Sequence, residues 1–352
     1  MMSTSKLIRP AVAAVAAGLF ALAAAPAQAI TIIPTFDSSI TSLSNASAVE
    51  AAFNTVAHDY AVSFANPVTV NVTVSWGSVG GQSLPSTAVG ASIDNLYGYY
   101  TYDQIRGALA AIAAGDPSDT ALATALTSMP AAAPSGVSQY AVASAEAKAL
   151  GLISDQTSID GYIGFAGLTS GFDFDPLDGI STGTYDFEGV AAHEMAEVLG
   201  RISGLYSPTP SFRTPFDLYR YKSAGVLSFG YNNAAYFSIN GGVKKLANFN
   251  VSRSGGDRGD WTVATGSTDV QGAFISTGRR YNLTNVDLTA LDVLGWSGSN
   301  NGDTKAGSPA GTAFALDSRG VPEPATWAML VTGFAALGAV LRRRRRPAAT
   351  PA

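Results

Sequence analysis

The chain has 352 residues, of which 47% are hydrophobic and 13% are charged, and its formal net charge is −5. This composition excludes a disordered charged tail, a coiled coil and a collagen-like fibre, and it predicts a packed globular protein. Because the sequence contains no cysteine, thiol catalysis, disulfides and cysteine-ligated metal sites are excluded as well.

Residues 1–29 have the features of a signal peptide. Lys6 and Arg9 precede an apolar run from Ala11 to Ala25, and Ala27-Gln28-Ala29 forms a small-x-small cleavage pattern. We therefore expect export, with signal peptidase as a processing partner. An uncleaved membrane anchor is the alternative.

The other end of the chain predicts a second sorting segment, at residues 321–346. An apolar run from Ala325 to Leu341 is long enough to cross a bilayer, and Arg342 to Arg346 follow it directly. The preceding residues 298–320, rich in Ser, Gly, Asn and Asp, are expected to form a linker, and residues 347–352 a short tail.

Pro322-Glu323-Pro324 stands just before this apolar run. The motif, the apolar run and the arginine cluster occur in the order typical of the PEP-CTERM sorting signal, which the segment resembles. The resemblance implies an exosortase as partner, a transient anchor in the inner membrane, and release to the cell surface or the exopolysaccharide matrix. A plain membrane anchor is the alternative.

Without its two ends the chain keeps 14 basic and 25 acidic residues. Such a domain has no electrostatic footprint for a polyanion, so nucleic-acid binding is not expected.

Hydrophobic periodicity and turn residues predict the elements of the first half. These are helices at 47–65, 103–114, 118–129 and 138–150 and strands at 68–76 and 159–165. Alternating valines make the strand at 68–76 the clearest of them.

In the second half, a helix is expected at 187–200, where Gly200 is well placed to end it. Asn240-Gly241 predicts a hairpin turn between strand-like pieces at 235–239 and 244–249. A last short helix is expected to be capped by Asn285. No repeat is visible, so the expected fold is a single α+β domain at residues 30–297.

The helix at 187–200 contains the one compact reactive cluster. His193 and Glu197 are four residues apart and share a helix face, so both can reach one cation, and Glu194 lies beside them. Zinc accepts a carboxylate as well as an imidazole, whereas an added carboxylate also favours harder ions such as manganese. The alternative is a structural helix in which Glu197 pairs with Arg201.

At these residues the chain resembles a zincin-type metallopeptidase, more closely bacterial surface proteins with an HExxEVxGR-like helix. The resemblance implies one zincin-like domain with a mixed sheet and an active-site helix. It also implies that His193 and Glu197 are ligands and that Glu194 is the general base on water activated by the metal. The chain departs from the metzincin branch, which has a further ligand where this chain has Ser203.

The third ligand has to come from elsewhere in the chain. Asp217, 24 residues past His193, is the first choice, with a surface carboxylate paired with Arg220 as the alternative. His58 is the second choice, and it is also typical of a partly exposed helix residue.

Three other groups of residues are weaker candidates. Asp186 and Glu188 suit the N-terminal dipole of the helix, and Tyr219 or Tyr221 suits an oxyanion donor. The acidic loop with Asp173, Asp175 and Asp178 suits Ca²⁺ or a solvated turn.

The leading functional hypothesis is a secreted or surface-sorted metal-dependent hydrolase that cleaves a protein or peptide substrate. A non-catalytic surface or exopolysaccharide-matrix protein on a zincin scaffold is the alternative. Polysaccharide cleavage by paired carboxylates is disfavoured, because Glu194 and Glu197 share one helix instead of flanking a cleft.

Overall fold

The computed structural model describes residues 30–298 except for 156, 168–170, 206–211, 252–254 and 265. All of them belong to one compact unit. The predicted signal peptide, the C-terminal sorting segment, the tail and all but the first residue of the linker lie outside the described residues. Among the helices that the structure describes, none combines the length and the apolar composition of a membrane span.

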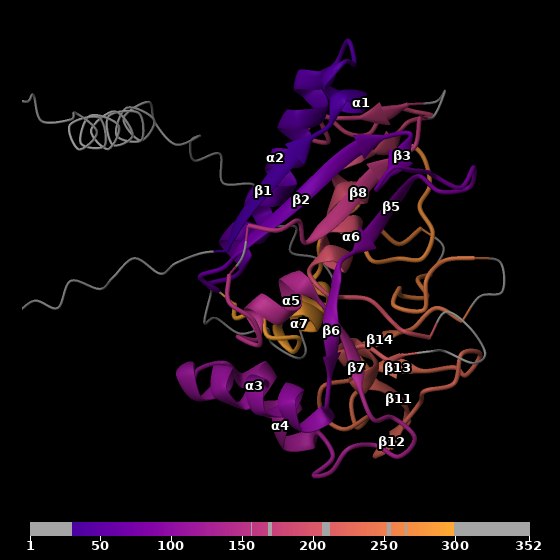
Figure 1. Ribbon diagram of the computed structural model, residues 1–352. Helices are drawn as coiled ribbons and strands as arrows, with labels where there is room; N and C mark the ends of the chain where they lie inside the picture. Colours follow the sequence, from indigo (N-terminus) through magenta and orange to yellow (C-terminus); the bar gives the residue numbers. More distant parts are fainter. Residues whose placement is uncertain are drawn as a thin grey trace, which may run out of the picture. The chain divides into compact units, whose positions relative to one another are not determined.

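A four-stranded mixed sheet lies at one end of this unit (Figure 1). Its order is β1 (Thr31–Phe36), β2 (Thr69–Trp76), β8 (Gly161–Phe165) and β5 (Gly90–Asp94). The first three strands run parallel, whereas β5 pairs antiparallel with β8 and has no other partner strand among the described residues. The alternating valines of β2 are buried, as the sequence pattern predicts.

Two helices pack on this sheet: α2 (Ala46–Ser63) lies against β1, and α6 (Phe187–Val198) lies against α2, β8 and β5. Glycine in the strands allows α6 to come close. A Cβ atom on Gly161 would lie 2.8 Å from a methyl group of Val198. The short helix α1 (Ser38–Thr41) precedes α2.

The rest of the unit consists of shorter elements. The helices are α3 (Tyr102–Gly115), α4 (Thr120–Ser128), α5 (Ser144–Ala149), the 3₁₀ turn Pro215–Tyr219 and α7 (Asn285–Asp292). Antiparallel strands are β6 (Leu96–Tyr100) with β7 (Tyr140–Ala143), and β3 (Ser78–Val79) with β4 (Gln82–Ser83). β9 (Phe172–Asp173) pairs parallel with β10 (Tyr185–Asp186).

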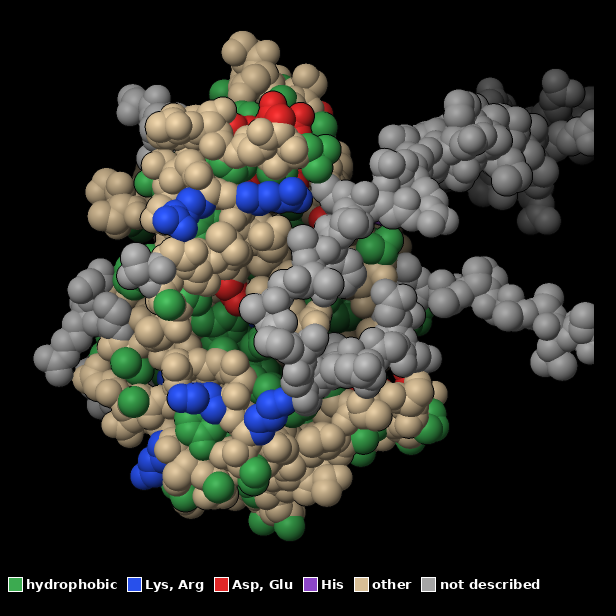
Figure 2. All heavy atoms as spheres, turned by 180° about the vertical axis from the view of Figure 1, so that it is seen from behind, with side chains coloured by type: hydrophobic (Ala, Val, Ile, Leu, Met, Phe, Trp, Pro, Cys, Tyr) green, Lys and Arg blue, Asp and Glu red, His purple; other side chains and the backbone are tan. Residues whose placement is uncertain are grey.

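A second sheet follows in the order β12 (Val226–Leu227), β11 (Arg220–Ser223), β13 (Tyr236–Phe237) and β14 (Ala247–Asn248). Its core is aromatic, with ring centroids 5.1 to 6.5 Å apart among Phe216, Phe237, Phe249 and Trp261. Seen from behind, basic and acidic side chains lie in small separate groups on a mostly uncharged surface (Figure 2).

The predicted α+β class is confirmed. Two local predictions are wrong. Residues 140–143 form β7 instead of the start of a helix, because they pair with β6, and α5 begins only at Ser144. The cap of α7 is Thr284 and not Asn285, since the Thr284 side chain accepts from the amide of Asp287. The hairpin around Asn240-Gly241 forms, although its strands have two residues each.

Candidate metal centre

Helix α6 is fixed at both ends. At the start, Asp186 accepts from the amide of Gly189, and Phe187 packs 4.4 Å from the ring of Phe165. At the end, Gly200 adopts φ +102°, a left-handed conformation that favours glycine. Trp296, from the far end of the described chain, donates to the carbonyl of Leu199 at 2.7 Å. The helix that carries the predicted cluster is therefore held in one position.

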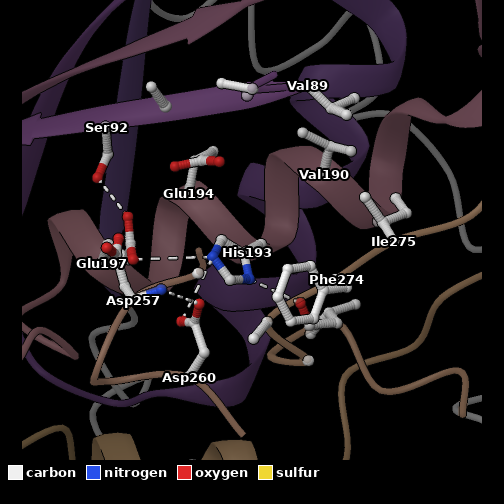
Figure 3. A pocket seen from close by; sticks show the side chains of 18 of the residues that line it. Val89, Ser92, Val190, His193, Glu194, Glu197, Asp257, Asp260, Phe274 and Ile275 are labelled. Carbon is white, nitrogen blue, oxygen red and sulfur yellow. Dashed lines mark hydrogen bonds and ion pairs between the residues drawn. The ribbon is translucent and has the colours of Figure 1, made fainter. Parts of the chain in front are cut away.

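His193 points from α6 into a cavity, and its tautomer can be derived (Figure 3). Its Nδ1 lies 2.8 Å from the carbonyl oxygen of Val270. Because a carbonyl only accepts, Nδ1 carries the hydrogen when the ring is neutral, and Nε2 keeps its lone pair. The lone pair of Nε2 is the one available to a metal.

Glu197 lies one turn further along the same face of α6. Its Oε2 accepts from the hydroxyl of Ser92 on β5 at 2.6 Å. Its Oε1 lies 3.7 Å from Nε2 of His193. The edge strand therefore orients this carboxylate and leaves one oxygen directed toward the histidine.

Asp260 completes the group from a loop far along the chain. Its Oδ1 lies 3.7 Å from Nε2 of His193, and one ligand atom from each of the three residues lies within 4.8 Å of the others. Ligands about 2.0 to 2.2 Å from a tetrahedral metal are roughly 3.3 to 3.6 Å apart, so the three groups need little movement to share one ion.

The hydrogen bonding of Asp260 also fits a ligand. The residue is only 3% exposed, and its Oδ2 accepts from the amide of Asp257 at 3.0 Å. Its Oδ1 is buried without a hydrogen-bond partner among the described residues. A buried carboxylate oxygen without a partner is costly, and a bound cation removes that cost. His193, Glu197 and Asp260 form a group that could hold a metal ion.

Arg201 supports Asp260 from the core. Its side chain is fully buried, stacked 4.3 Å above the ring of Trp261, and its Nη1 lies 3.9 Å from Oδ1 of Asp260. The alternative pairing of Arg201 with Glu197 is not what the structure shows. Burial raises the pKa of Asp260, and the positive charge of Arg201 acts in the opposite direction, toward the ionised form.

Glu194 lies beside the group, between α6 and β5 (Figure 3). It is 6% exposed and lines the cavity. Burial and then the charge of Glu197 raise its pKa well above the usual range. A divalent cation beside it would act in the opposite direction, toward the ionised form. A carboxyl poised in this way suits proton transfer.

Carboxyl groups outnumber basic side chains around His193, Glu197 and Asp260, so the surroundings are strongly acidic. The charge of Glu197, followed by burial, raises the pKa of Asp257 to about 6. Burial lowers the pKa of His193, but Asp260 and Glu197 outweigh it, so the pKa of the imidazole is raised. Both shifts have the direction expected of a site with an excess of negative charge that a cation would neutralise.

The cavity has a volume of about 540 Å³. Its lining includes the chain from Thr87 to Ser92, with the start of β5, and the segment from Gly272 to Ile275. Phe274 and Ile275 lie on the His193 side (Figure 3). A chain segment can therefore lie between a strand edge and an apolar wall, over the group of three residues.

Asp217, the predicted third ligand, is not brought to this group. It is fully buried and accepts from the Ser203 hydroxyl at 2.6 Å and from the amides of Gly204 and Thr214 at 3.0 and 3.1 Å. Both its oxygens thus hold a turn together, and Asp260 takes the expected place. His58 is an exposed residue of α2 and is not in the group either.

The other candidates have structural roles. Asp186 is the cap of α6, as its position suggests, and its second oxygen accepts from the amide of Tyr281. Tyr219 donates to the carbonyl of Val293 and does not line the cavity, and neither does Tyr221.

The acidic loop with Asp173, Asp175 and Asp178 forms turns. Asp173 accepts from the amides of Asp175 and Ser181, and Asp175 accepts from the amide of Leu177. Within the described residues, only His193, Glu197 and Asp260 form a potential three-ligand group. The loop therefore has the geometry of a hydrogen-bonded acidic turn.

Comparisons with protein-family models, with curated proteins and with solved structures each gave no match to this chain. Its function is therefore inferred from its own residues and their geometry.

Proposed function

We propose that this chain is a secreted, zincin-like metallopeptidase. The observation that carries the proposal is the convergence of His193 Nε2, Glu197 Oε1 and Asp260 Oδ1 on one point of a cavity that also contains Glu194. One imidazole and two carboxylates suit zinc, while the second carboxylate makes manganese a realistic competitor. A dication held there would polarise a carbonyl group and make water more acidic.

The residues around the group suit peptide hydrolysis. Glu194 would take a proton from a water molecule in the cavity and later give it to the departing amine. Strand β5 borders the same cavity, and no strand of the described residues pairs with its outer edge. An extended peptide can add to such an edge as a further strand, which would place its carbonyl groups near Glu194.

The sorting segments of the sequence support an exported peptidase. We propose that the signal peptide and the PEP-CTERM-like segment bring the domain to the cell surface or the exopolysaccharide matrix, by way of a temporary anchor. Fractionation of cells that express a variant lacking Pro322-Glu323-Pro324 tests this part, because processing by an exosortase should then fail.

The substitution Glu194→Gln tests the catalytic proposal. The variant should keep one equivalent of metal by mass spectrometry and lose about 10²- to 10⁴-fold in hydrolysis of an unfolded protein substrate, since it removes the base and no ligand. Metal binding without hydrolysis by the wild-type protein would instead support a structural metal in a non-catalytic surface protein. If the protein binds no metal even after metal supplementation, both the peptidase proposal and the structural-metal alternative would be contradicted.

A further inference from the structure

A second cavity of about 340 Å³ adjoins the metal centre on its Glu197 side. Ser92, Glu197 and Asp257 line both cavities, so the two are neighbouring parts of one site. The second cavity adds Asp94, from the end of β5, and the apolar side chains of Leu96, Ile202 and Phe212.

The two-residue period of β5 fixes the face of the strand on which the Asp94 side chain lies. A Cβ atom on Gly90 would lie 2.7 Å from Glu194, and Ser92 donates to Glu197. Residues two apart on a strand share a face, so Asp94 is the next side chain in this row. It faces the metal side of the sheet and lines the second cavity.

The carboxyl group of Asp94 forms no ion pair with a basic side chain of the described residues. Asp94 is half-buried as a whole, yet its Oδ1 atom is buried and has no hydrogen-bond partner among the described residues. The charged groups that act on it are Glu197 and Asp257, both acidic. Arg258 also lines the cavity, but its Nε donates to the carbonyl of Tyr231 and its guanidinium stacks on that ring.

We propose that this second cavity binds the cationic side chain of a substrate residue, lysine or arginine, next to the bond that is cleaved. The inference rests on the proposed peptidase function. An aliphatic stem would pack against Leu96, Ile202 and Phe212, and its charged end would pair with Asp94 and Asp257. A peptide on the edge of β5 alternates its side chains in the same way, so one of them points where Asp94 points.

A second metal ion explains this cavity less well. Among the described residues, the potential metal group does not include Asp94 or Asp257. The cavity is also far larger than an ion and has apolar walls, which suit an organic cation.

The test uses otherwise identical peptides in which lysine, norleucine or glutamate occupies each position in turn. With the wild-type protein, kcat/KM for the best lysine peptide should exceed that of its norleucine counterpart at least tenfold. Asp94→Asn should bring this ratio close to one. Asp103→Asn, at an exposed position of α3, is the matched control and should keep the ratio.

Three outcomes separate this inference from the proposed function. Hydrolysis with a ratio near one, or a ratio that Asp94→Asn does not change, would overturn the inference alone. If no peptide is cleaved, the peptidase proposal fails. Binding of the same peptides then tests the cation site by itself. A lysine preference in binding that Asp94→Asn removes would still support the cation site, whereas equal binding would refute it.

Discussion

Asp260 and Asp217 are two buried aspartates with opposite surroundings. Both oxygens of Asp217 accept hydrogen bonds, from the Ser203 hydroxyl and from the amides of Gly204 and Thr214, whereas Oδ1 of Asp260 lies 3.9 Å from Arg201 and has no hydrogen-bond partner among the described residues. The first arrangement stabilises the chain, and the second leaves a coordination position open. This difference separates a structural carboxylate from a ligand.

Asp260→Asn should therefore abolish metal binding, measured as metal equivalents per protein, because an amide is a poorer ligand than a carboxylate. Asp217→Asn should keep the metal and lower the free energy of unfolding by about 1 to 3 kcal/mol, since the side-chain amide keeps one acceptor oxygen for the backbone amides but offers no second acceptor to the Ser203 hydroxyl. Retention of a full equivalent of metal by Asp260→Asn would contradict its assignment as a ligand. Circular dichroism of both variants controls for folding.

At the scale of the elements, the site depends on how closely α6 approaches the edge strand. A Cβ atom at Gly90 would lie 2.6 Å from a methyl group of Val190 and 2.7 Å from Oε1 of Glu194. Both distances are shorter than real contacts of this kind, so an added methyl group has to push the side chain of Glu194 or the helix aside.

Gly90→Ala should accordingly reduce kcat strongly, at least tenfold, while the protein stays folded and keeps its metal. Gly107→Ala is the matched control, because nothing lies near the added methyl group in the interior of α3. That variant should keep full activity and gain about 0.5 to 1 kcal/mol in stability. Equal activity of the two variants would show that the position of Glu194 does not matter.

Some helices and strands can be predicted from the sequence because their residue pattern is local, and others cannot. Helix α6 and its paired residues His193 and Glu197 follow from local spacing, and β2 follows from its alternating valines. β7 was predicted as helix, because four consecutive apolar residues suit either element and only their pairing with β6 decides.

Asp260 was missed for a similar reason. A ligand brought by a distant loop has no spacing relative to the helix that a pattern could reveal. The one local signal was two aspartates in a glycine-rich loop directly before a tryptophan, at residues 255–261. That tryptophan is the buried anchor of the loop: Trp261 is 1% exposed and donates to Asp287 at 2.7 Å.

At the scale of the whole molecule, many carboxyl groups are buried with raised pKa values. Burial and the nearby Asp119 raise the pKa of Asp292 to about 9, and burial and Asp287 raise that of Asp269 to about 7. The native state then holds protons that the unfolded chain releases near pH 4. Stability should therefore fall as the pH rises from about 4 toward these values.

Asp292→Asn should flatten this dependence. Urea unfolding between pH 5 and 8 should show the wild-type protein losing more stability than the variant, by up to about 1.4 kcal/mol per pH unit. The difference between the two slopes should vanish below about pH 3, where the aspartic acid is protonated in both states. Parallel profiles would contradict a raised pKa for Asp292, and Asp103→Asn serves as the exposed control.

The sequence separation of the proposed ligands determines when the site can form. His193 and Asp260 are 67 residues apart, and α6 is held at its end by Trp296. A chain that is synthesised from its N-terminus presents the helix first and Asp260, the last of the three proposed ligands, much later. Closing so long a loop is slow and entropically costly until the later contacts form. On the function proposed above, the site would be assembled last, so that the peptidase would remain harmless to the machinery that carries it.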